Sequence, residues 1–76
     1  GKNDPKYDAF RERVERLPGY LHTTFDLLIQ ALPNKTIAKK LGLSEATVRS
    51  YISEIFTTLG YTNRGELPIT AIKAGY

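Results

Sequence analysis

The tightest constraint on the fold is the stretch NKTIAKKLGLSEATVRSYI, residues 34 to 52, in which only Gly42-Leu43-Ser44 separates two helical patterns. Apolar residues recur at spacings of three and four on both sides of that break. Two helices joined by so short a turn, with glycine at the corner, are typical of a helix-turn-helix unit, whose helices cross at about 90 to 120°. The sequence therefore predicts that the second helix projects from the surface.

Three more helices are expected around this unit. A charged helix over residues 4–16 has Asp4 as its N-cap and Pro5 at its first position, and it either pads the core or docks against a missing domain. A second helix is expected over residues 20–32. The fold class is therefore all-α, a small helical bundle with a helix-turn-helix and an additional N-terminal helix.

Caps and breakers predict where the remaining helices begin and end. We expect Asn34 to cap the third helix and Ser44 to cap the fourth, which runs to about residue 59. Asn63 and Glu66 stand at capping-box spacing before a last helix. Pro68 conflicts with that start, because proline cannot donate the backbone hydrogen bond needed there, so we expect the helix to begin at residue 66 or 67 or to kink.

Composition excludes several classes of function. Seventy-six residues make one small domain, and the absence of cysteine excludes disulfides and thiolate metal sites. His22 is the only histidine, so we expect no metal, no cofactor and no enzyme activity. No apolar run is long enough to span a membrane, and we expect a soluble, cytoplasmic protein. The chain lacks methionine, so Gly1 is expected to be the remnant of a cut or tag on a piece of a longer protein.

The second helix of the unit carries polar residues that have no expected place in the core. In a helix-turn-helix these side chains lead the helix into the DNA major groove, and the net charge of +3 suits a polyanionic partner. Arg49 is the strongest candidate, because a guanidinium can bond O6 and N7 of guanine together. The predicted base-reading residues are Glu45, Ala46, Arg49, Ser50 and Ser53.

The segment PNKTIAKKLGLSEATVRSYISEIFTTLGYTNRGEL resembles the LuxR-type, or GerE-type, DNA-binding domain, whose pattern runs S-N-K-E-I-A, I-S-x-x-T-V-K, I-Y-x-K-L-G-V and S-R-x-E-L. The match extends without a gap over residues 17–76, which leaves residues 1–16 as a linker or additional N-terminal helix. The resemblance implies four family helices, sequence-specific binding of double-stranded DNA, and a role as the output domain of a bacterial transcription regulator. It also implies RNA polymerase as a partner and a receiver or sensing domain elsewhere in the protein.

The resemblance further implies roles for individual residues. Contacts to DNA phosphates are expected from Asn34, Lys35, Thr47 and Tyr51. The dimer surface of the family corresponds to Leu67, Ile69, Ile72 and Tyr76. Arg64 and Glu66 match the cap of the last helix.

Departures from the family pattern leave a second hypothesis open. Residues 17–21 replace the opening L-T-x-R-E, Thr58 replaces a lysine, and Pro68 alters the dimer helix. We therefore expect a homodimer on DNA but a monomer when the domain is isolated. The alternative function is a protein-interaction module that has lost DNA binding and uses Tyr61, Ile69, Ile72 and Tyr76. Lys35, Lys39 and Lys40 are equally well explained as the solvated face of an amphipathic helix.

Overall fold

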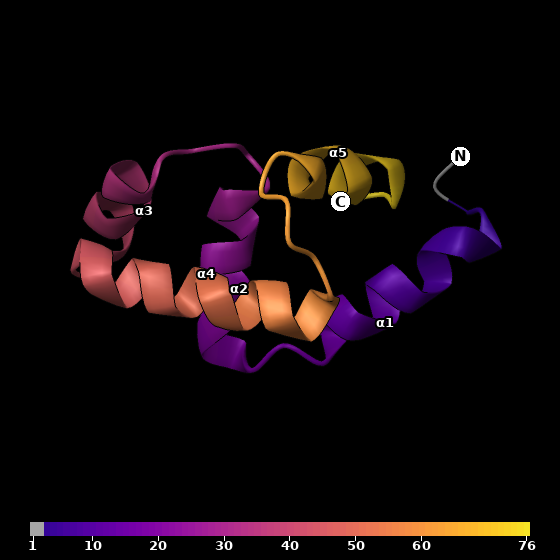
Figure 1. Ribbon diagram of the computed structural model, residues 1–76, viewed down its shortest axis with the longest axis horizontal. Coiled ribbons are helices and arrows are strands. Elements are labelled where there is room, and N and C mark those ends of the chain that lie inside the picture. Colours follow the sequence, from indigo (N-terminus) through magenta and orange to yellow (C-terminus); the bar gives the residue numbers. More distant parts are fainter. Residues whose placement is uncertain (1–2) are drawn as a thin grey trace.

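Helix α4 (Glu45–Leu59) runs along the long axis of the molecule, and the other helices pack at successive places along that axis (Figure 1). The computed structural model describes residues 3–76, and Gly1, the expected remnant, lies outside the described residues. Within this range the protein is all-helical, without a strand, so the predicted fold class is confirmed. The elements in chain order are η1 (Pro5–Tyr7), α1 (Asp8–Glu15), α2 (Gly19–Leu28), α3 (Asn34–Leu41), α4 (Glu45–Leu59) and α5 (Glu66–Lys73).

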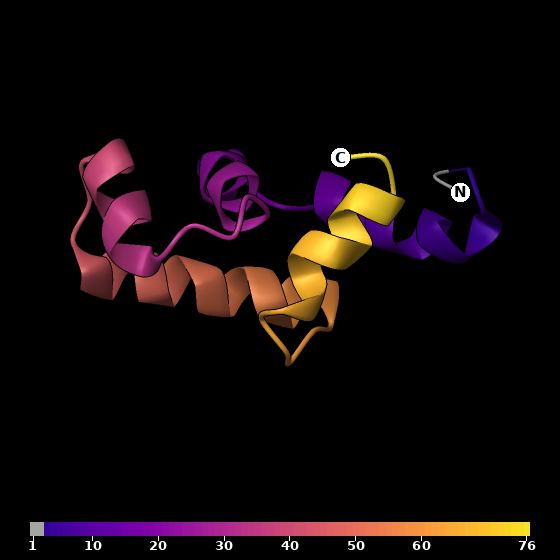
Figure 2. The same ribbon diagram turned by 90° about the horizontal axis from the view of Figure 1, so that it is seen from above.

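The arrangement is elongated, with extents of 37 × 20 × 20 Å. In Figure 1, α3 lies at the N-terminal end of α4, α2 crosses behind the middle of α4, and α1 continues beyond its C-terminal end. Figure 2, seen from above, shows α5 beside the C-terminal half of α4 and close to α1. The helices enclose one apolar core from residue 10 to residue 74, made of Phe10, Val14, Leu17, Leu21, Phe25, Leu28, Ile37, Ala38, Val48, Ile52, Ile55, Leu59, Leu67, Ala71 and Ala74.

The helix-turn-helix unit forms as its local signals predict. Gly42 closes α3 with a φ of 68°, in the left-handed region that favours glycine, and Gly60 closes α4 with a φ of 74°. Ser44 caps α4, since its side chain accepts a hydrogen bond of 3.1 Å from the Thr47 backbone N–H. These interactions depend on residues at most a few positions apart, which explains why the sequence predicts them.

Helix α2 ends earlier than predicted. We expected it to reach residue 32, but it stops at Leu28, because the chain turns through Ala31 with a φ of 61°. The Gln30 and Ala31 N–H groups donate to carbonyls three residues back, Leu27 and Leu28 at 3.2 and 3.0 Å, instead of four residues back as in an α-helix. The early end leaves the Leu32 carbonyl outside any helix, where a distant side chain can reach it.

Two predicted caps are wrong. Pro33 stands at the N-cap of α3, and Asn34 is the first helical residue rather than the cap. Gly65 stands at the N-cap of α5, and Asn63 instead accepts a hydrogen bond of 2.9 Å from the Gly65 N–H in the preceding loop. Helix α5 starts at Glu66, which confirms the expectation drawn from Pro68. Backbone N–H groups in the first turn of a helix have no helical acceptor, so the N–H that proline lacks is not needed there.

Helix α1 is part of the same core. Pro5 opens a 3₁₀ turn, and the α-helix itself begins only at Asp8. Phe10 and Val14 are buried, and the Phe10 ring meets the Tyr61 and Tyr76 rings edge to face at 5.8 and 6.0 Å. These contacts favour the interpretation of α1 as a helix that completes the core.

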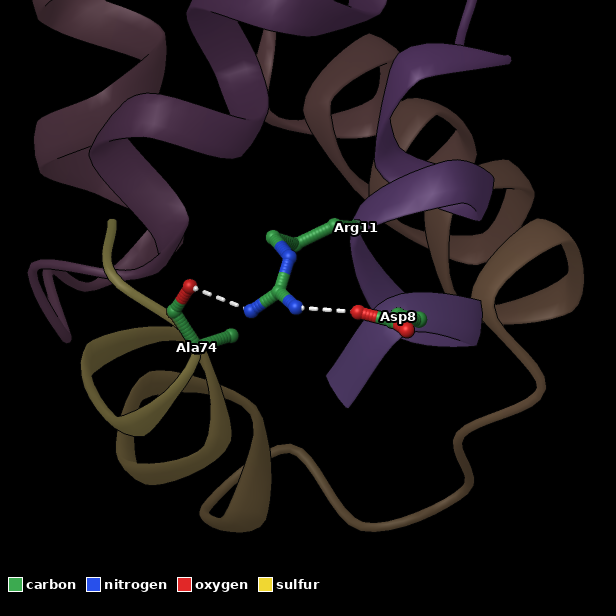
Figure 3. A network of polar contacts seen from close by, with 3 residues as sticks. All are labelled: Asp8, Arg11 and Ala74. Atoms are coloured by element: carbon green, nitrogen blue, oxygen red, sulfur yellow. Dashed lines mark hydrogen bonds and ion pairs between the residues drawn. The ribbon is translucent and has the colours of Figure 1, made fainter. Parts of the chain in front are cut away.

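Two arginines of α1 reach the C-terminal ends of other helices. Arg13 donates to the Leu59 carbonyl at 3.2 Å, and Arg11 donates to the Ala74 carbonyl at 3.1 Å while pairing with Asp8 (Figure 3). Carbonyls in the last turn of a helix lack helical donors and carry partial negative charge. The guanidinium groups therefore stabilise the ends of α4 and α5, which sequence spacing alone does not reveal.

Candidate nucleic-acid interface

The five predicted base-reading residues lie together on the outer face of α4. Their side chains are all exposed, whereas Val48, Ile52 and Ile55 on the opposite face are buried. This division follows from the helical period, because residues three and four apart share a face. The outer face of α4, which we call the reading face, consists of Glu45, Ala46, Arg49, Ser50 and Ser53.

The C-terminal part of the reading face stands as a ridge between two surface hollows. Ser53 and Thr57 border both of them. One hollow separates α4 from the start of α2 and is lined by Pro18, Leu21, Ser50, Ser53, Glu54, Thr57 and Thr58. The other is lined by Asn34, Arg49, Ile52, Ser53, Phe56, Thr57, Gly60, Tyr61 and Thr62. The C-terminal part of the reading face therefore projects between two open hollows.

The cations of the helix-turn-helix unit are exposed. Within residues 3–76, Arg49 has no hydrogen-bond or ion-pair partner, so its five guanidinium N–H groups are available. Lys35, Lys39 and Lys40 of α3 are exposed as well, and they surround a shallow hollow together with Thr36. Their positions fit both a solvated face and a phosphate-binding face.

Thr47 is tied to the cap of α4. Its hydroxyl accepts a hydrogen bond of 2.9 Å from the Ser44 hydroxyl, while its backbone N–H donates to the same oxygen. The Thr47 hydroxyl keeps its own proton as a donor. The predicted phosphate contact is therefore chemically open to Thr47, although one acceptor site of its hydroxyl serves the cap.

Asn34 has a partner that the sequence did not indicate. Its side-chain oxygen accepts a hydrogen bond from Nη1 of Arg64, and Nη2 of the same guanidinium donates to the Leu32 carbonyl at 2.8 Å. Thirty or more residues separate these partners in the chain, so no local pattern could have identified them. Arg64, expected to belong to the cap of α5, instead joins the loop before α5 to the start of α3.

Tyr51 packs against α2. Its ring meets the Tyr20 ring edge to face at 5.2 Å, and the Tyr20 hydroxyl donates to Oε2 of Glu54 at 2.6 Å. The hydrogen bond to Glu54 raises the pKa of Tyr20 above its ordinary value. Tyr51, predicted to contact phosphate, thus lies beside a tyrosine and a carboxylate that sequence reasoning missed. The replacement of the expected arginine by Tyr20 was the available signal.

The predicted dimer residues do not share one surface. Leu67 is wholly buried and belongs to the core, because the first turn of α5 points inward. Ile69 and Ile72 are 57% and 68% exposed and form an apolar outer face. Tyr76 is half-exposed, but its ring packs edge to face on Phe25 at 5.6 Å. Leu67 is therefore unavailable to a partner in this conformation.

The described residues form neither a metal-binding cluster nor a membrane-spanning helix. Within residues 3–76, no group of three or more His, Cys, Asp or Glu side chains is placed to hold a metal ion. In the same part of the chain, none of the helices combines the length and apolar character that crossing a bilayer requires.

Comparison with known proteins agrees with this geometry. Residues 23–71 match the family of bacterial regulatory proteins of the luxR type. The chain is 33% identical over 82 residues to response regulator Rre1 of Synechocystis, covering 88% of this chain and 35% of that protein. It is also 37% identical over 51 residues to spore germination protein GerE of Bacillus subtilis, covering 67% of this chain and 69% of GerE. No solved structure gives a significant match.

The family match covers α3, α4 and the turn between them, together with most of α2 and α5. It therefore includes every residue of the reading face and both partners of the bond between Asn34 and Arg64. The chain spans about a third of the length of Rre1, so what it shares with that protein is one part of a longer regulator. On this evidence the chain belongs to the luxR family of bacterial regulatory proteins.

Proposed function

We propose that this chain is a DNA-binding output domain of a transcription regulator, and that it binds double-stranded DNA sequence-specifically with α4 in the major groove. The observation that carries the proposal is the reading face, an exposed and mainly polar helix face whose Arg49 has no hydrogen-bond or ion-pair partner within residues 3–76. The major groove of B-DNA is wide enough to admit a helix. The relatives fit this role, since one is a response regulator, and the family is one of regulatory proteins.

The reading face supplies suitable chemistry for bases. The Arg49 guanidinium can donate two hydrogen bonds to O6 and N7 of one guanine, and the Glu45 carboxylate can accept from the amino group of cytosine. Ser50 and Ser53 can donate or accept, so they tolerate several bases. Ala46 offers a small apolar surface that suits the thymine methyl group.

Phosphate contacts would fix the orientation of α4 in the groove. Lys35 contributes charge, while Asn34, Thr47 and Tyr51 contribute hydrogen-bond donors from both helices of the unit. These contacts carry no sequence information and act on every duplex alike. Sequence specificity would therefore come from the reading face, and affinity for DNA would come largely from the phosphate contacts.

We expect DNA to determine the oligomeric state of the domain. Two copies would bind one site as a homodimer, whereas the isolated domain would be monomeric, because Pro68 delays the start of α5 and Leu67 is buried. The resemblance to LuxR-type domains adds RNA polymerase as a partner and the cytoplasm as the location. Sedimentation of the free domain at micromolar concentration tests the monomer, and a stable dimer built on α5 would contradict it.

Selection of bound duplexes from a random pool tests the proposal directly. The expected result is an enriched motif with two-fold symmetry, bound more tightly than a shuffled duplex of the same composition. Typical specific sites are bound about 10³- to 10⁷-fold more tightly than non-specific DNA. Failure of the folded domain to bind any duplex, or equal binding of selected and shuffled duplexes, would reject sequence-specific binding.

The exposed apolar face of α5 favours one alternative, a protein-interaction module without DNA binding. Ile69 and Ile72 are more than half exposed, and Tyr61 and Tyr76 lie near the same end of the molecule. Exposed apolar patches mark protein contacts. This alternative predicts that the reading face tolerates Arg49→Ala without any functional loss, while Ile72→Ser abolishes function; the DNA-binding proposal predicts a loss for Arg49→Ala.

A further inference from the structure

The guanidinium of Arg64 forms hydrogen bonds to the residues on both sides of Pro33. It donates to the Leu32 carbonyl at 2.8 Å on one side and to the Asn34 side-chain oxygen on the other. Pro33 stands at the N-cap of α3 and offers no side-chain cap to the first turn. The position of that first turn is therefore held from outside, by a residue in the loop that leads to α5.

The chemistry of the two side chains fixes the orientation of the Asn34 amide. A guanidinium carries five N–H donors and no acceptor, whereas an asparagine amide has one acceptor end and one donor end. Arg64 can therefore bond only the carbonyl end of Asn34. The NH₂ end is turned away from Arg64, so it remains able to donate.

A free donor at this place matters because Asn34 and Arg49 line the same hollow beside the reading face. An amide presenting its oxygen there would repel a phosphate, whereas an amide presenting NH₂ can donate to one. Arg64 itself is partly buried, and within residues 3–76 no carboxylate pairs with it. Its other link is through its carbonyl, which accepts from the Leu67 N–H of α5 at 3.3 Å.

We propose that Arg64 is a positioning residue for DNA binding, which turns the NH₂ group of Asn34, in the first turn of α3, toward a DNA phosphate. The inference rests on the proposed function and deepens it. Arg64 acts through Asn34 rather than as a phosphate ligand of its own. Duplex affinity therefore depends on a side chain in the loop before α5, outside the helix-turn-helix unit.

The test is a double-mutant cycle on duplex affinity, with Arg64→Met, Asn34→Ala and the double variant. Loss of one hydrogen bond is expected to weaken binding about 3- to 10-fold per subunit, equally on selected and shuffled duplexes. Arg64→Met should add no further loss in the Asn34→Ala background. Thermal denaturation of each variant establishes that binding is measured on folded protein, and if Arg64→Met does not fold, Arg64→Gln, which is neutral and lacks the guanidinium fork, replaces it in the cycle.

The salt dependence separates positioning from direct contact. A cation that contacts phosphate contributes about 0.9 to the slope of log affinity against log salt, whereas the neutral Asn34 amide contributes nothing. Arg64→Met is therefore expected to leave the slope unchanged. Arg13→Met is the matched control, since Arg13 also donates to a backbone carbonyl, Leu59, but at the far end of α4, and it should not alter affinity.

Three outcomes would overturn the inference while leaving the proposed function intact: a reduced salt slope in Arg64→Met, losses that add in the double variant, or an equal loss in Arg13→Met. The first would make Arg64 a phosphate ligand, the second would make it independent of Asn34, and the third would reduce it to a general contribution to stability. If the folded wild-type domain bound no duplex, the proposed function would fail, and the inference would fail with it.

Discussion

Helices α4 and α5 both expose one face, but the two faces differ in chemistry. The outer face of α4 carries a guanidinium, a carboxylate and two hydroxyls, whereas α5 exposes Ile69 and Ile72. Polar groups that stay hydrated suit the groove of a nucleic acid, and exposed apolar side chains suit another protein surface. The two helices therefore present chemically different surfaces, of which we propose that of α4 for DNA.

The helices also begin differently. Ser44 caps α4 through its own side chain, while α5 begins after Gly65 with no side-chain cap and has Pro68 in its first turn. The long helix is thus stabilised locally, and the short one depends on its packing against the core through Leu67 and Ala71. Substitutions that act on one helix and spare the other therefore test this difference between α4 and α5.

The largest expected effect is that of salt on duplex binding. Each subunit would contribute Lys35, Arg49 and one or two further lysines, so a dimer would neutralise about six to eight phosphates. The affinity for a duplex should therefore fall about 10³- to 10⁴-fold between 50 and 200 mM salt. Lys35→Ala should reduce the slope, whereas Lys73→Ala on α5 should not. Fluorescence anisotropy titrations measure both, and a flat salt dependence would contradict the DNA-binding face.

Substitutions on the buried and exposed faces of α5 should differ in their effect on stability. Leu67→Ala removes a wholly buried side chain, so it should lower the free energy of unfolding by about 2–5 kcal/mol. Ile72→Ala, on the exposed face, should change it by less than about 0.5 kcal/mol. Urea denaturation measures the pair; similar losses for both would mean that the exposed face is covered in solution.

Arg49→Ala, a substitution on α4, should reduce the preference for guanine at one position of the DNA site. A bidentate contact to guanine is worth about 1–3 kcal/mol of discrimination at one position of the site. Lys35→Ala, as the matched control, should weaken all duplexes alike, since a phosphate contact reads no bases. Repeating the selection of duplexes with each variant gives the comparison. An unchanged motif with Arg49→Ala would mean that this part of α4 does not contact the bases.

The smallest effect concerns the helix caps. Ser44→Ala removes the side-chain acceptor of the Thr47 N–H and should cost about 1 kcal/mol of stability. Asn63→Ala removes the acceptor of the Gly65 N–H in an exposed loop, where water can replace it, so its cost should be smaller. Thermal denaturation ranks the two, and a larger loss for Asn63→Ala would show that α5 depends on a local cap after all.

The features that the sequence predicts correctly depend on interactions between residues close together in the chain. The turn at Gly42, the cap at Ser44 and the stop at Gly60 each depend on residues within about one helical turn. The start of α5 at Glu66 followed from a single property of Pro68, its missing N–H. The reading face followed from the helical period, because the buried residues of α4 leave the others outside.

Tertiary structure alone decided how distant segments meet. The bond between Arg64 and Asn34, the contacts of Arg11 and Arg13 with the ends of α5 and α4, and the burial of Leu67 all join parts of the chain far apart in sequence. An apolar stripe says that a helix face will be buried but not against which neighbour. Backbone and capping energetics are local and can be read along the chain, whereas the choice of packing partner depends on all helices at once.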